Sequence, residues 1–477
     1  MTDQMPGDLN ELVNQIIDFS ISQATLFGAK QESQEKRDYV FRRNTSKEAL
    51  EEDGAAYFGF ISPEEESSGP YHDLSLVIFP GTKYGDPWLV ALGIGTLGYK
   101  NDYELAIIPG LRRSFSKIIN PQNGFLKTSF LDIESKLPKE FTQKIPGIPK
   151  TLSTYGKLLP ACEIIDPTKD EGKEKIRAFI AVYSNMRQWA TNNNHRDNIQ
   201  RAINKCTKSQ IVDDEGVVLA LIKQRKFVVL QGAPGTGKTR LAQIIADRLN
   251  SKTFFTQFHA ETSYSDFIFG IKPDVDKDNL QYTYKKGIFY QALEYSQAHP
   301  ESNTVLIVDE INRANLANIL GPIFYLFEYD SDRHDVPVLI GGELSIQKIP
   351  ENFYLIATMN TADRSLAMVD FALRRRFAWY TLYPHIISDG LKEGRNFFSE
   401  DFQSMDRIFQ WYAKTEELVF QPGQSYFIAQ GDDEMRNRIR YELYPLITEY
   451  LSEGILINAK EDLIHYFRER LGGEIAP

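Results

Sequence analysis

Two kinds of hydrophobic pattern divide the chain near its middle. Before about residue 170, short apolar runs are separated by charged stretches, whereas after residue 227 near-continuous apolar runs alternate with helical spacing. Near-continuous apolar strands separated by helices are typical of a parallel sheet that is covered on both faces. The second half therefore predicts five parallel strands, over residues 227–230, 253–258, 305–308, 353–357 and 377–382.

The first part of the chain predicts a small α+β domain. Apolar residues at loosely helical spacing predict an opening helix over residues 9–27. Short apolar runs bounded by Pro, Gly and Asp predict strands over residues 74–79, 88–94 and 103–108. Residues 30–66 are charged and lack periodicity, which predicts a solvated loop.

Helical spacing also marks two stretches outside the predicted strands. One of them, which starts at residue 171 and resumes around residue 200, is interpreted as a connector between the two halves. The other follows the last strand, over residues 402–419 and 433–451, and predicts a small helical domain. The predicted domains are accordingly residues 1–170, 171–209, 210–385 and 386–477.

Composition allows a sizeable core and restricts the class of protein. The chain has 477 residues, of which 42% are hydrophobic and 25% charged, as in ordinary globular proteins. A net charge of −11 disfavours nucleic-acid binding over the whole surface but leaves room for a local basic patch. The two cysteines, Cys162 and Cys206, form no disulfide framework. No apolar run is long enough to span a membrane, so we expect a soluble, cytoplasmic protein.

The strongest motif follows the first strand of the second half. Residues 232–239 match G-x-x-x-x-G-K-[ST] in full, between that strand and a predicted helix over residues 240–249. Glycines let backbone N–H groups curl around a phosphate, and the helix N-terminus adds its positive dipole end. Lys238 is predicted to reach the β- and γ-phosphates, and the Thr239 hydroxyl to bind Mg²⁺. The predicted nucleotide-binding residues are Gly232, Ala233, Pro234, Gly235, Thr236, Gly237, Lys238, Thr239 and Arg240.

Polar residues end two of the later strands. Asp309 and Glu310 follow the strand over residues 305–308, and Asn360 ends the run that begins at residue 353. The carboxyl ends of parallel strands open into the ligand crevice, which predicts that these side chains lie beside the phosphates. Asp309 is predicted to hold Mg²⁺ and Glu310 to polarise the attacking water. Asn360 either orients that water or contacts the γ-phosphate, and the alternative is that it is a plain turn residue.

Three consecutive arginines, Arg374, Arg375 and Arg376, precede the last strand. Adjacent guanidinium groups near a phosphate site predict an arginine finger that is supplied in trans to the nucleotide of a neighbouring subunit. The alternative is that they are cations favoured by the C-terminus of a helix. The sequence does not tell which of the three is the finger.

Two longer segments make the chain resemble a known family. Residues 309–315 (DEINRAN) and 359–365 (MNTADRS) together resemble the McrB-type AAA+ NTPases of the dynein-related and MoxR-like branch. Residues 257–259, 263–270, 372–377 and 423–427 match as well, although Gln424 stands where that family usually has His. We assign no role to Gln424. The resemblance covers about residues 210–451 and implies an AAA+ P-loop domain of α/β class with a helical lid, preceded by a separate α+β domain.

The resemblance also implies a mode of action. It implies a homo-oligomeric, hexameric ring with nucleotide sites between subunits, and an McrC-like partner that carries the nuclease and stimulates hydrolysis. It places Asn360 and Asp363 in the hydrolysis signature, and Arg374 and Arg375 at the junction between subunits. The nucleotide is GTP or ATP, with GTP slightly favoured by residues 359–365. A β-hairpin predicted over residues 336–349, with a Gly-Gly turn, is similar to the one inserted before the sensor strand in this branch.

The role of the N-terminal domain rests on its position alone. In McrB-like proteins this variable domain selects the DNA target, yet residues 1–170 hold more acidic than basic side chains. Five aromatic residues are candidates for stacking on a flipped base, and core positions are the alternative for all of them: Tyr57, Phe58, Tyr71, Tyr84 and Trp88. We find no nuclease constellation, so cutting is expected of a partner.

The leading hypothesis is therefore an enzyme, the motor subunit of a modification-dependent or antiphage restriction complex that contacts DNA through its N-terminal domain. One alternative is an AAA+ chaperone of the MoxR or dynein-related kind that remodels a protein client. Another is a nucleotide-gated scaffold with marginal turnover. Fold-level analogy alone does not separate the three.

Overall fold

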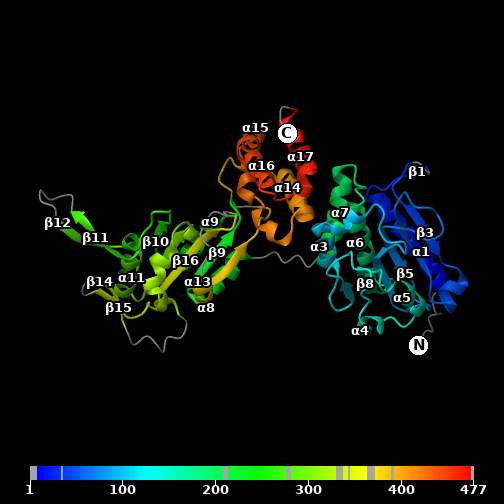
Figure 1. Cartoon of the computed structure of the whole chain (residues 1–477), viewed down its shortest axis with the longest axis horizontal. Coiled ribbons are helices and arrows are strands. Elements are labelled where there is room, and N and C mark those ends of the chain that lie inside the picture. The colour runs from blue at the N-terminus through cyan, green and yellow to red at the C-terminus, as the bar shows by residue number, and fades with distance from the viewer. Residues whose placement is uncertain are drawn as a thin grey trace. The chain divides into compact units, whose positions relative to one another are not determined.

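The chain folds into two compact units, the first reaching Gln210 and the second comprising almost all of the rest (Figure 1). The computed structural model describes residues 8–33, 36–207, 213–274, 281–328, 337–341, 344–362, 371–387 and 391–473. In that part of the chain, no helix is both long and apolar enough to cross a membrane.

The first unit is built on a six-stranded antiparallel sheet with the order β3-β4-β5-β6-β8-β7. Its strands are β3 (Val40–Asn44), β4 (Tyr57–Ile61), β5 (Leu74–Phe79), β6 (Trp88–Ile94), β7 (Gly124–Leu126) and β8 (Ala161–Ile165). Four helices bury their apolar sides on one face, namely α1 (Leu9–Leu26), α3 (Pro109–Ile118), α6 (Asp170–Met186) and α7 (Asn193–Cys206). The short helices α4 (Lys139–Thr142) and α5 (Pro149–Tyr155) cover the other face.

The opening helix and the strands β5 and β6 confirm the sequence prediction, but two other predictions in this unit are wrong. Residues 30–66 are not a loop, because they contain β3 and β4 and the short pair β1 (Gln31–Ser33) and β2 (Lys36–Arg37). The strand β3 was not predicted because it contains arginines, which the sequence pattern assigns to solvent. Arg42 is nevertheless buried, and its guanidinium donates to the carbonyls of Glu66 and Gly69. The stretch over residues 103–108 is the helix α2 (Tyr103–Ile107), because a five-residue apolar run does not distinguish helix from strand.

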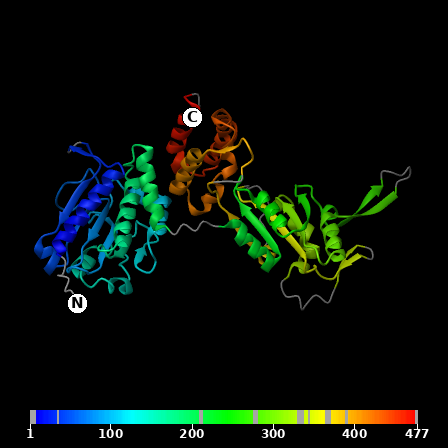
Figure 2. The same ribbon diagram turned by 180° about the vertical axis from the view of Figure 1, so that it is seen from behind.

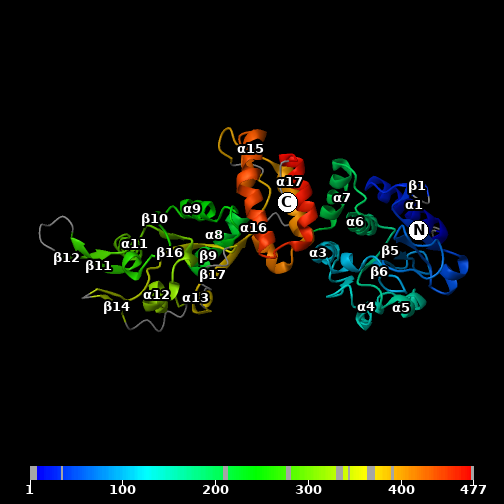
Figure 3. The same cartoon turned by 45° about the horizontal axis from the view of Figure 1, so that its top comes forward.

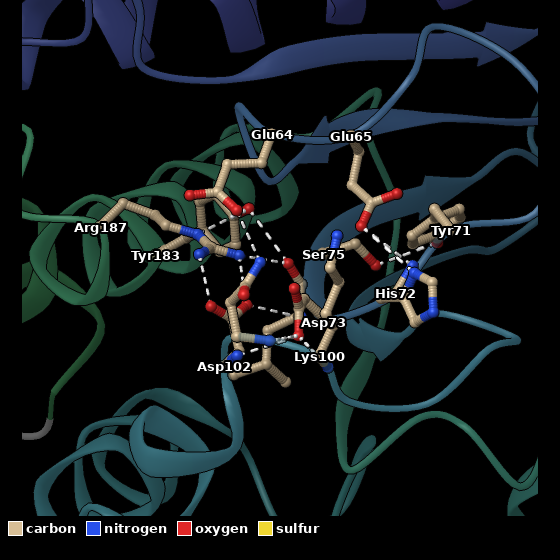
Figure 4. A network of polar contacts seen from close by, with 12 residues as sticks. Glu64, Glu65, Tyr71, His72, Asp73, Ser75, Lys100, Asp102, Tyr183 and Arg187 are labelled. Carbon is tan, nitrogen blue, oxygen red and sulfur yellow. Dashed lines mark hydrogen bonds and ion pairs between the residues drawn. The ribbon is translucent and has the colours of Figure 1, made fainter.

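A buried polar network joins α6 to the sheet (Figure 4). Asp73, just before β5, has a left-handed backbone (φ +69°), and its Oδ1 accepts hydrogen bonds from the backbone N–H groups of residues 100, 101 and 102 at 2.8–2.9 Å. Asp102 forms a bidentate ion pair with Arg187 at the end of α6, at 2.8 and 2.6 Å. This network and the shared core make α6 and α7 part of the first unit, where we had expected a separate connector over residues 171–209.

The second unit contains a five-stranded parallel sheet with the order β10-β13-β16-β9-β17, which confirms the five predicted strands. The strands are β9 (Phe227–Gly232), β10 (Lys252–Gln257), β13 (Thr304–Asp309), β16 (Phe353–Asn360) and β17 (Ala378–Leu382). On one face lie α8 (Asp214–Arg225) and α9 (Lys238–Arg248), and on the other α11 (Ile288–Ala298) and α12 (Leu316–Leu320) (Figure 3). This is the α/β class expected from the sequence.

Two antiparallel hairpins extend from this sheet domain (Figure 2). The predicted one is present as β14 (Val338–Gly341) and β15 (Leu344–Ile346), although Gly342 of its turn lies outside the described residues. The other, β11 (Phe269–Asp274) with β12 (Gln281–Lys286), was not predicted, because Gly270 and Pro273 interrupt the apolar pattern of its first strand.

A helical subdomain follows the sheet. Its main helices are α14 (Ser399–Tyr412), α15 (Asp432–Arg438), α16 (Tyr444–Ser452) and α17 (Lys460–Leu471), with the short pair β18 (Asn396–Phe397) and β19 (Ile428–Ala429). Fully buried side chains such as Phe409, Phe427 and Met435 form its core. This subdomain has the position and content predicted for the lid.

Candidate nucleotide site

The phosphate-loop motif lies between β9 and α9, as its sequence context predicts. Gly235 and Gly237 have φ values of +80° and +86°, a left-handed conformation that glycine adopts without strain. The helix α9 begins at Lys238, directly after the loop. Its unbonded N–H groups and its positive dipole end therefore face the loop, which makes this the natural place for an anion.

Lys238 is held inside the loop. Its Nζ donates to the carbonyl oxygens of Gly232 and Ala233 at 3.0 and 2.7 Å. Burial lowers its pKa to about 8, although the neighbouring Asp309 carboxylate opposes this shift. A negatively charged group bound in the loop would favour the charged ammonium, so the side chain is suited to a phosphate.

Asp309 lies at the centre of a hydrogen-bonded group at the carboxyl end of β13. Its Oδ1 accepts from the Thr239 hydroxyl at 2.6 Å and from the Thr358 hydroxyl at 2.7 Å. Thr358 Oγ1 in turn accepts from the backbone N–H of Glu310 at 3.0 Å. Thr358 therefore fixes both acidic residues. Thr358 was not predicted from the sequence, since a threonine within a strand carries no signal of its own.

The donor set fits Mg²⁺ bound together with a nucleotide. The Thr239 hydroxyl and the Asp309 carboxylate are hard oxygen ligands that face each other across 2.6 Å. Mg²⁺ is usually held by one or two protein oxygens plus phosphates and water, rather than by an all-protein cage. Among the described residues, no group of three or more His, Cys, Asp or Glu side chains suited to a metal occurs.

Glu310 has a strained backbone. Its φ and ψ are both 51°, a left-handed conformation that a residue with a side chain rarely adopts. Such conformations persist where the surroundings impose them, often at functional sites. The Glu310 carboxylate is half-buried and forms an ion pair with Arg313. This geometry turns the side chain after Asp309 away from the regular path of the strand.

Asn360 lies at the same carboxyl end of the sheet, as predicted. It ends β16 and lies in register with Gly232, the first residue of the phosphate loop. Its side-chain oxygen accepts from the Ala362 N–H at 3.2 Å, and its carbonyl accepts from Asn312 Nδ2 at 3.2 Å. The structure therefore brings Thr239, Asp309 and Asn360 to one edge of the sheet. Asp363, predicted to act with them, lies outside the described residues.

The three arginines lie at the opposite end of the sheet. They end α13 (Phe371–Arg376), directly before β17, and β17 runs parallel to β9 with Ala378 beside Val228 and Leu382 beside Gly232. A strand of five residues is roughly 16 Å long, which separates these arginines from the phosphate loop of their own chain.

Only two of the arginines are accessible. Arg376 is 8% exposed and forms an ion pair with Glu328. Arg375 is exposed and reaches the same carboxylate at 3.2 Å, and the exposed Arg374 lies over the Trp379 ring at 5.2 Å. Burial makes Arg376 a structural residue.

A cleft of about 920 Å³ adjoins the loop. It lies between the first turn of α9, residues 391–395 and the lid. Its lining is mainly charged and includes Arg240, Lys392, Arg395, Arg438, Glu434 and Tyr441. Its volume is in the range of pockets that hold a ligand of nucleotide size.

The aromatic candidates of the first unit differ in burial, and Tyr57 is partly buried against the core. Phe58 and Trp88 are fully buried in the core and pack against each other at 6.2 Å. The Tyr71 ring lies under Arg42, and burial raises its pKa to about 12. Tyr84, at 46%, is the most exposed of the set. The core interpretation therefore holds for Phe58 and Trp88.

Comparison with known proteins agrees with this geometry. Residues 227–377 match the AAA domain of the dynein-related subfamily. The chain is 33% identical over 259 residues to the type IV methyl-directed restriction enzyme EcoKMcrB subunit of Escherichia coli K12, covering 49% of this chain and 55% of the relative. The second unit carries an AAA+ domain of McrB type.

A further relative has a restriction role by name. The type II restriction enzyme BsuMI component YdiS of Bacillus subtilis 168 is 29% identical over 190 residues, which cover 32% of this chain. The McrB-type chain spans about half the length of each of these relatives, 55% in both cases.

Proposed function

We propose that this McrB-type chain is a Mg²⁺-dependent nucleoside triphosphatase that drives a DNA restriction complex. The observation that carries the proposal is the group formed by Thr239, Asp309, Thr358 and Glu310 beside the phosphate loop. It supplies a metal position, a carboxylate for the attacking water and a phosphate cradle at one edge of a parallel sheet, where ligands of such sheets bind.

Each residue has a distinct part in the proposed reaction. Backbone N–H groups of the loop and the Lys238 ammonium bind the β- and γ-phosphates. Thr239 and Asp309 hold Mg²⁺, which neutralises charge on the phosphate oxygens when it is bound. Glu310 accepts a hydrogen bond from the attacking water and polarises it. Asn360 and Asp363 belong to the same hydrolysis signature, with Asn360 orienting the water.

The nucleotide is GTP or ATP. Its base and ribose fit the cleft beside Arg240 and the lid, whose charged lining offers both donors and acceptors. The proposed roles of the loop and Lys238 are confined to the phosphates, so we assign the choice between purines to the cleft.

We further propose a ring, hexameric as in the resembling family, in which Arg374 or Arg375 reaches the nucleotide of the next subunit. The exposure of these two arginines and their distance from their own phosphate loop support this part of the proposal. A separate McrC-like nuclease subunit would cut DNA that the N-terminal unit selects. The restriction enzymes among the relatives support this setting.

The test is steady-state hydrolysis of GTP and ATP by the full chain, with and without the product of the adjacent reading frame. Hydrolysis that requires Mg²⁺ and rises several-fold with that product would support the restriction motor. Turnover that is indifferent to the product would favour an AAA+ chaperone of the same branch, because the matched domain is dynein-related. Nucleotide binding without turnover would favour a nucleotide-gated scaffold.

A further inference from the structure

The lid is hydrogen-bonded directly to the phosphate loop through residues 423–425, which we call the lid clasp. The Gly423 N–H donates to the carbonyl of Pro234 at 2.9 Å, and the Ser425 N–H donates to the carbonyl of Gly235 at 3.0 Å. Between them, the Gln424 side chain donates through Nε2 to the carbonyl of Thr236 at 2.9 Å. Three successive carbonyls of the loop are thus bonded to the lid.

The clasp fits the loop too closely for larger residues. A Cβ atom on Gly423 would lie 2.1 Å from the carbonyl carbon of Gly235 and 2.3 Å from the Thr236 nitrogen. A Cβ atom on Gly235 would lie 2.4 Å from Ser425 Oγ. Glycine on both sides permits this contact, since real Cβ atoms do not approach backbone atoms so closely.

These bonds bear on anion binding because they fix which way the loop's peptide groups point. A phosphate is bound by backbone N–H groups that converge on it. A peptide whose carbonyl is bonded to the lid has its N–H directed to the other side, since the two groups of a planar peptide point in opposite directions. The clasp therefore sets the direction of the N–H groups of Gly235 and Gly237, whereas the Thr236 N–H donates within the loop to the Ala233 carbonyl at 3.4 Å.

Among the described hydrogen bonds of the clasp to the loop, that of Gln424 comes from a side chain, and this side chain is almost completely buried, with 6% exposed. Its Oε1 is buried as well and makes no hydrogen bond in the described part of the chain. Replacing the amide would therefore act on the loop alone, because Nε2 is bonded to the Thr236 carbonyl.

The clasp is also tied to the lid helices. Arg438, the last residue of α15, donates to the carbonyl of Ser425 at 2.9 Å and to that of Ile428 at 2.5 Å. It forms an ion pair with Glu442 at 2.7 Å. A displacement of the lid helices would therefore move the clasp and alter its hydrogen bonds to the loop carbonyls.

We propose that Gln424 is a positioning residue of the nucleotide site, which couples the lid to the phosphate loop by donating to the Thr236 carbonyl. This inference rests on the proposed nucleotide binding. Gln424 orients the loop and does not touch the reacting atoms.

The experiment measures the affinity of a fluorescent, non-hydrolysable analogue of GTP or ATP, whichever the full chain binds more tightly. Gln424→Leu keeps the volume but removes the donor, and we expect about a three- to tenfold higher Kd, as for the loss of one hydrogen bond. Gln424→Glu keeps the shape but, when ionised, cannot donate. Its Kd should exceed that of Gln424→Leu at about pH 8 and approach the wild-type value at about pH 5.5, where protonation restores a donor.

The matched control is Ile457→Ala, which changes an exposed lid residue outside the clasp and should bind as the wild type does. Gly423→Ala, which cannot fit against Gly235, should weaken binding more than tenfold. Wild-type affinity in Gln424→Leu, or a Gln424→Glu defect that is the same at both pH values, would overturn the inference. A wild-type chain that binds neither nucleotide would instead refute the proposed function, because Gln424 could then not be the cause.

Discussion

Replacement of Thr358 by valine tests the arrangement of the two acidic residues. The substitution conserves shape but removes the hydroxyl that donates to Asp309 and accepts from the Glu310 N–H. A hydrogen bond to a charged group contributes about 1.5–3 kcal/mol, and a buried N–H without an acceptor costs about 1–3 kcal/mol. If the hydrogen bond to the charged Asp309 no longer stabilises the transition state, kcat falls by about ten- to a hundredfold, since 1.36 kcal/mol is one factor of ten.

The assay is steady-state phosphate release at saturating nucleotide and Mg²⁺, with thermal unfolding measured in parallel. Thr381→Val is the matched control, because this hydroxyl on the edge strand β17, next to β9, accepts only from Gln231 and bonds neither acid in the described contacts. We expect the control to keep its turnover. A folded Thr358→Val variant with kcat within twofold of the wild type would refute the assignment of Asp309 and Glu310 to the reaction.

Three further predictions follow from the site. Because burial lowers the pKa of Lys238 to about 8, and bound phosphate favours the charged form, nucleotide Kd should rise by up to tenfold per pH unit above about pH 8; a flat Kd between about pH 8 and pH 9.5 would contradict this. Chains with Arg374→Ala and Arg375→Ala combined should be inactive alone but regain hydrolysis when mixed with Lys238→Ala chains, because each supplies what the other lacks across the subunit junction; mixtures no more active than their components would exclude action in trans. Arg376→Ala should instead lower the free energy of unfolding by about 1–3 kcal/mol, measured by urea denaturation, since it removes a buried guanidinium that is paired with the partly exposed Glu328; unchanged stability would show that this pair is not structural.

The nucleotide site was largely predictable from sequence because its parts lie on local patterns. The phosphate loop is a contiguous motif, and Asp309, Glu310 and Asn360 end apolar strands whose parallel order follows from helices between them. Thr358 and the lid contact of Gln424 were not predictable, because each depends on which residues the fold brings together over a long separation in sequence.

The first unit was less predictable because its charged residues do not mark its surface. Arg42 lies buried within a strand, and Asp102 and Arg187 form an ion pair inside the protein. In this unit, charged residues in the sequence therefore do not identify the segments that are exposed to solvent. The helix α2 was predicted as a strand because its apolar run is short. Tyr103 and Ile107 are exposed one helical turn apart, a pattern that five residues are too few to distinguish from a strand.

We propose that this McrB-type chain hydrolyses a nucleoside triphosphate and that Glu310 polarises the attacking water. Comparing the wild type with Glu310→Gln tests both parts of this proposal. Nucleotide binding and steady-state hydrolysis are measured on the full chain and on Glu310→Gln, in Mg²⁺ and in EDTA. We expect Glu310→Gln to bind GTP or ATP as the wild type does, while its turnover falls by at least a hundredfold. EDTA should abolish hydrolysis by both chains. Undiminished turnover in a folded Glu310→Gln chain would contradict this proposal.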